Sequence, residues 1–69
     1  MTYLGYFIHI RGYARQGAGV EAEITANSGE HISIADSDRF SAEASAREIV
    51  DYASCRGIAL DAASQYVLH

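Results

Sequence analysis

The sequence predicts an α+β fold in which a three-stranded antiparallel meander is followed by one helix and a short C-terminal strand. Segments before residue 36 alternate apolar and polar residues with a period of two, as half-buried strands do. A later segment carries apolar residues at helical spacing and ends at a glycine. With 69 residues the chain has room for a single domain, 1–69, whose helix packs on one face of the sheet (β-β-β-α-β).

The first strand is expected over residues 3–14, where aromatic and β-branched residues alternate. Its even positions, from Leu4 to Ile10, form the better core face. Its odd positions place four large side chains on the outer face: Tyr3, Phe7, Arg11 and Tyr13.

Two further strands are expected at 20–26 and 31–35, each with apolar even positions. Pairing Ile10 with Ile24, and Ile24 with Ile34, keeps the apolar residues of all three strands on one face. This register also sets Arg11 opposite Glu23, an opposite-charge pair that stabilises a sheet.

A helix is expected from about Ala42 to Arg56, with Ser41 as its N-cap and Gly57 in the left-handed position after its end. Glu43 with Arg47, and Arg47 with Asp51, have the spacing of ion pairs on its wet side. The buried stripe is expected to consist of Ala42, Ala46, Ile49, Val50 and Ala53.

The tail has two interpretations. Residues 65–68 form a short strand in the favoured one, because Tyr66-Val67-Leu68 is β-prone and a single alanine-rich helix leaves the core thin. In the alternative, residues 60–67 form a second, shorter helix.

Composition narrows the function classes. Five Arg and no Lys stand against nine acids, and the formal net charge is −4. This balance argues against general nucleic-acid affinity and favours a protein partner with a basic surface. No apolar run approaches the roughly 20 residues of a membrane span, and residues 1–3 lack the basic start of a signal peptide. A cytoplasmic protein that does not enter membranes is therefore expected.

The sequence offers no catalytic, metal or cofactor site. His9, His31, Cys55 and His69 are scattered, with no pair at ligand spacing. Cys55 falls near the end of the expected helix, where the helix dipole disfavours a thiolate. Neither a metal, a cofactor nor an enzymatic activity is predicted.

Two groups of residues are candidates for binding a partner. The first is the outer-face stripe already named, since Tyr, Phe and Arg anchor many protein interfaces. An alternative role for these side chains is base stacking on single-stranded nucleic acid, but the negative charges of Glu21 and Glu23 would repel the phosphates. A structural alternative is that the tail or a loop covers these side chains. The second group is acidic and surrounds the helix: Asp36, Asp38, Glu43 and Asp51, flanked by Glu30 and Glu48. The acidic group also has structural explanations: Asp36 and Asp38 could be turn and helix-capping residues, and the other acids could lie on a solvated helix face.

No family motif is present in these residues. Small size, acidity and the lack of catalytic parts resemble the profile of small phage-encoded inhibitors, including anti-CRISPR proteins that occlude basic grooves of nucleic-acid-binding complexes. The resemblance covers this profile and no individual residue. It implies a protein-binding inhibitor or adaptor. The alternative is a structural or regulatory homo-oligomer, for instance a homodimer, that uses the aromatic sheet face or a sheet edge as its interface.

Overall fold

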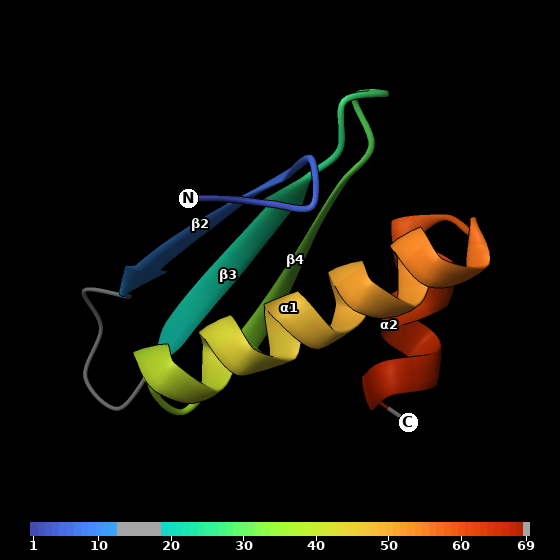
Figure 1. The fold of residues 1–69 in the computed structure, drawn as a ribbon. Helices are drawn as coiled ribbons and strands as arrows, with labels where there is room; N and C mark the ends of the chain where they lie inside the picture. Colours follow the sequence, from blue (N-terminus) through green and yellow to red (C-terminus); the bar gives the residue numbers. More distant parts are fainter. Residues whose placement is uncertain (13–18, 69) are drawn as a thin grey trace.

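Four antiparallel strands in one sheet, followed by two helices, make up the computed structural model, which describes residues 1–12 and 19–68 (Figure 1). The strands are β1 (Thr2–Tyr3), β2 (Tyr6–Gly12), β3 (Val20–Thr25) and β4 (His31–Asp36), which are neighbours in that order. The helices are α1 (Arg39–Arg56) and α2 (Leu60–Leu68). The protein has an α+β fold with an antiparallel sheet, as expected. The expected β-β-β-α-β order is wrong at both ends of the chain, because the observed order is β-β-β-β-α-α.

The first correction concerns residues 3–14, which do not form one strand. Leu4 and Gly5 both have positive φ, 52° and 84°, and connect β1 to β2 as a two-residue hairpin turn. Leu4, expected in the core, is 57% exposed. β2 then ends at Gly12, and Ala14 lies outside the described residues. A leucine in the left-handed region is uncommon. Leu4 therefore gives no turn signal in the sequence, and the alternating pattern continues through the turn.

The second correction concerns the tail, where α2 replaces the expected strand. Leu60 and Ala63 are fully buried and Val67 is packed against the core, so the helical spacing of these three residues outweighs the β propensity of residues 66–68. The backbone N–H of Leu60 donates to the Glu30 side chain at 3.0 Å, which ties the start of α2 to the sheet.

The strand register keeps the predicted faces but is shifted by two residues. Ile24 pairs with Ile8 and Ile32 instead of Ile10 and Ile34, and Arg11 lies opposite Glu21 instead of Glu23. A shift of two leaves every side chain on its predicted face, so the apolar pattern cannot detect it. Between β3 and β4 the register follows from the turn, where the Ala26 N–H donates to the Glu30 carbonyl at 2.8 Å.

The predicted buried stripe of α1 is confirmed, as all five of its residues are buried. The predicted N-cap is wrong: Asp38 accepts a hydrogen bond from the Ser41 N–H at 2.8 Å, and the helix begins at Arg39. Gly57 has the predicted left-handed conformation, with φ of 66°. Both helices lie on one side of the sheet (Figure 1), and the described residues include no element that covers the other side.

Candidate functional site

A groove of about 450 Å³ lies between one side of α1 and β1. Residues three or four apart on α1 line its length, because such residues share a helix face. The β1–β2 hairpin supplies the remaining wall, since Tyr3 pairs with Tyr6 and so takes the helix side of the sheet. The lining residues are Tyr3, Phe40, Glu43, Ala44, Arg47, Glu48 and Asp51.

A polar network joins β1 to α1 at the groove. The Tyr3 hydroxyl donates to Asp51 Oδ1 at 2.9 Å, and the Arg47 guanidinium lies 5.6 Å from the centre of the Tyr3 ring. Arg47 forms the predicted ion pair with Glu43 at 2.8 Å, whereas Asp51, its other expected partner, receives Tyr3 instead. The hydrogen bond to Asp51, together with desolvation, raises the pKa of Tyr3 above its ordinary value near 10, because both favour the protonated phenol.

The groove carries more negative than positive charge. Glu43, Glu48 and Asp51 face a single guanidinium, that of Arg47. Glu48 is exposed and has no ion-pair partner among the described residues. Phe40 is 76% exposed, the highest fraction among the large apolar side chains of the described chain. Carboxylates beside aromatic rings are the groups that hold a Lys or Arg side chain, whose head is charged and whose stem is apolar.

The predicted aromatic stripe is divided by the fold. Tyr3 lies in the groove on the helix side, Tyr13 lies outside the described residues, and only Phe7 and Arg11 share the uncovered face of the sheet. Phe7 is 50% exposed. These two residues are four positions apart on one strand, so they do not form a continuous aromatic surface.

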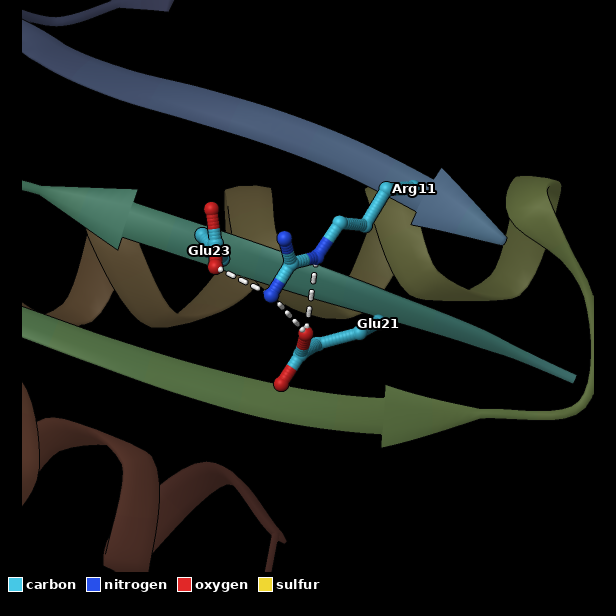
Figure 2. Close-up of polar contacts among 3 residues, drawn as sticks. All are labelled: Arg11, Glu21 and Glu23. Atoms are coloured by element: carbon cyan, nitrogen blue, oxygen red, sulfur yellow. Dashed lines mark hydrogen bonds and ion pairs between the residues drawn. The ribbon is translucent and has the colours of Figure 1, made fainter. Parts of the chain in front are cut away.

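Arg11 is held within its own sheet (Figure 2). Its Nη2 lies 3.0 Å from Glu21 Oε1 and 3.0 Å from Glu23 Oε2, and its Nε donates to Glu21 Oε1 at 3.1 Å. The Glu21 and Glu23 side chains are only 18% and 25% exposed. The Arg11 side chain therefore covers the carboxylates of Glu21 and Glu23. Because one guanidinium faces two carboxylates, this group of three residues has a net charge of one negative unit.

The predicted acidic group is also divided. Asp36 accepts from the Ser37 N–H at 2.7 Å and Asp38 caps α1, so both have the turn and capping roles that were the structural alternative. Glu43 and Asp51 line the groove, whereas Asp36 and Asp38 do not. The sequence reasoning missed Phe40. Its position three residues before Glu43 and seven before Arg47 places it on the polar side of α1, a signal that could have identified an exposed aromatic residue.

The remaining reactive groups of the described residues do not converge on a second site. No set of three or more His, Cys, Asp or Glu side chains in the described chain could hold a metal ion. Cys55 is exposed on α1. A stack joins α1 to α2, in which the Arg56 guanidinium lies 4.7 Å from the Tyr52 ring and Tyr52 packs on Tyr66 at 5.4 Å between centroids.

No family model matches the chain, and no curated protein or solved structure has significant similarity to it. Within residues 1–12 and 19–68, neither helix combines the length and apolar character that crossing a bilayer requires.

Proposed function

We propose that this chain is a small acidic protein-binding module that captures a basic side chain of a protein partner in the groove between α1 and β1. The observation that carries the proposal is the composition of one groove: three carboxylates, the Tyr3 ring and the exposed Phe40. Its volume of about 450 Å³ falls within the range of roughly 300–1,000 Å³ that is usual for binding pockets.

The chemistry favours a lysine or arginine over other ligands. Tyr3 and Phe40 supply aromatic surface for the stem and the cation, and Glu48 supplies a carboxylate that no ion pair within the described chain uses. The network of Tyr3, Arg47 and Asp51 holds the walls in place before the partner arrives, and such preorganisation reduces the entropy lost on binding.

The net charge of −4 extends this proposal to an inhibitor. An acidic chain is attracted to the basic surfaces on which proteins hold nucleic acid. If the groove accepts one arginine or lysine from such a surface, the chain occupies the site of the phosphates and blocks it.

The first test measures binding of a fluorescent arginine-rich peptide and of a glutamate-rich peptide of equal length by anisotropy at low salt. Glu48→Gln should weaken binding of the arginine peptide by up to about fivefold, because loss of one exposed ion pair is worth up to about 1 kcal/mol. Phe40→Ala should weaken it as well, since the cation loses the ring.

Asp61→Asn is the matched control. It removes one carboxylate from α2, outside the groove, and its amide oxygen can still accept the Ala62 N–H that Asp61 binds at 2.8 Å. This variant has the same net charge as Glu48→Gln. Equal loss of affinity in the two variants would show general attraction to the whole acidic chain and would refute a groove-specific function.

A further inference from the structure

The two edges of the sheet differ in whether another strand pairs with them. On one side the β1–β2 hairpin covers the start of β2, where the Ile8 N–H donates to the Met1 carbonyl and the Met1 amino group donates to the Ile8 carbonyl, both at 2.7 Å. On the other side β4 is the last strand, and the described residues include no strand beyond it. An unpaired edge is a template for another strand.

The register identifies which backbone groups of β4 point outward. The Ala26 N–H bonds to the Glu30 carbonyl, so residue 30 and every second residue after it face β3. The N–H and C=O groups of His31, Ser33 and Ala35 therefore point away from the sheet. All three residues are exposed.

β4 itself carries none of the sequence features that usually protect an edge strand. It is six residues long, pairs with β3 without a bulge, and contains neither proline nor lysine. From His31 to Ala35 it carries no Asp, Glu, Lys or Arg. Ile32, on the helix side, is only partly buried.

We propose that β4 pairs antiparallel with β4 of a second copy of this chain, with the two-fold axis at Ser33, and joins the two sheets into one. This axis uses all three outward residues: Ser33 lies opposite Ser33 of the second copy, and His31 lies opposite Ala35. Any other two-fold register of the same strand pairs fewer of them.

The side chains are compatible with this register. Ile32 lies opposite Ile34 of the second copy, so the partly exposed isoleucine gains an apolar neighbour. Ser33 and Ala35 are small and neutral. The only like charges that meet are Glu30 and Asp36 at the ends of the strand, and each is bonded within its own chain, to the Leu60 N–H and the Ser37 N–H.

The first experiment measures solution mass by sedimentation equilibrium over a concentration series, for the wild type and for Ser33→Pro. Proline removes an N–H that points away from β3, so the monomer loses no hydrogen bond and should retain its circular dichroism. The wild type should reach the dimer mass and the variant should remain monomeric. A wild type that remains monomeric at the highest concentration, or a folded proline variant that still dimerises, would overturn the proposal.

Disulfide cross-linking tests the register in a Cys55→Ser background. In a hydrogen-bonded antiparallel pair the facing Cα atoms are about 5.5 Å apart, within the roughly 4.4–6.8 Å that a disulfide spans. Ser33→Cys should therefore form a covalent dimer on mild oxidation. Ala35→Cys is the control, because its two copies would be offset by four residues, about 14 Å. Equal cross-linking of the two variants, or none at position 33, would contradict the axis at Ser33.

Discussion

At the scale of single residues, Gly19 shows how a backbone contact determines an amino acid. Its φ is +77°, and a Cβ added there would overlap the backbone oxygen of Asp36 at the end of β4. We expect Gly19→Ala to lower the free energy of unfolding by at least about 2 kcal/mol, since a left-handed alanine and a forced backbone shift each cost about 1–3 kcal/mol.

Gly12 is the matched control for that prediction. It does not have positive φ, and an added Cβ would meet no atom of the described residues within 4 Å. Gly12→Ala should be neutral or stabilise by up to about 1 kcal/mol, because alanine restricts the unfolded chain. Urea unfolding followed by circular dichroism measures both variants. Similar stabilities would show that the contact between Gly19 and Asp36 does not restrict the folded chain.

Individual residues also explain which parts of the candidate site the sequence could predict. Glu43 and Asp51 were expected on the wet side of the helix, and they line the groove. Tyr3 was expected on the opposite face of the sheet. The hairpin at Leu4 and Gly5 reverses the chain, so an odd residue of β1 shares a face with an even residue of β2. Neither the composition nor the alternating pattern of residues 3–14 predicts the turn that reverses the chain.

At the scale of elements, the sequence predicts those strands and helices whose own residues show a clear alternation or helical repeat of apolar positions. β3, β4 and the buried face of α1 alternate or repeat cleanly, and their predicted positions agree with the structure to within a few residues. The favoured strand at residues 65–68 is wrong and the alternative helix over 60–67 is confirmed as α2, because nine residues are too few for local propensity to decide between helix and strand. It is stabilised by its contacts with α1, β4 and the turn before β4.

The Glu30 carboxylate should therefore matter for α2 although it lies far away in the sequence. It accepts the Leu60 N–H at 3.0 Å at the helix start, where an acceptor and a negative charge are both favourable. Glu30→Ala should lower the free energy of unfolding by about 0.5–2 kcal/mol. Amide hydrogen exchange should accelerate first in residues 60–63.

Glu30→Gln and Glu48→Ala separate this effect from loss of charge. The glutamine retains an acceptor oxygen and should recover most of the stability. Glu48 is exposed and has no ion-pair partner within the described residues, so its truncation should change stability by less than about 0.5 kcal/mol. If Glu30→Ala left the exchange of the Leu60 amide unchanged, its carboxylate would not act as the cap of α2.

At the scale of the whole molecule, the net charge of −4 should make the two proposed interactions respond oppositely to salt. A basic peptide in the groove is attracted to the chain, and salt screens that attraction, since the Debye length falls from about 10 Å at 0.1 M to about 3 Å at 1 M. Two copies of the chain repel each other, and the proposed contact through β4 consists of neutral backbone bonds and isoleucines, with Glu30 and Asp36 meeting as like charges only at its ends. Screening should therefore weaken peptide binding and strengthen the dimer.

The measurement follows peptide anisotropy and solution mass in one salt series, from 50 mM to 1 M sodium chloride. We expect the peptide dissociation constant to rise by at least about tenfold, and the dimer dissociation constant to fall. Glu48→Gln should flatten the first trend and leave the second nearly unchanged, because its carboxylate lies in the groove. A dimer that dissociates as salt rises would mean that ionic contacts hold it, which β4 does not offer between His31 and Ala35. Peptide binding that is insensitive to salt would instead remove the electrostatic basis of the proposed function.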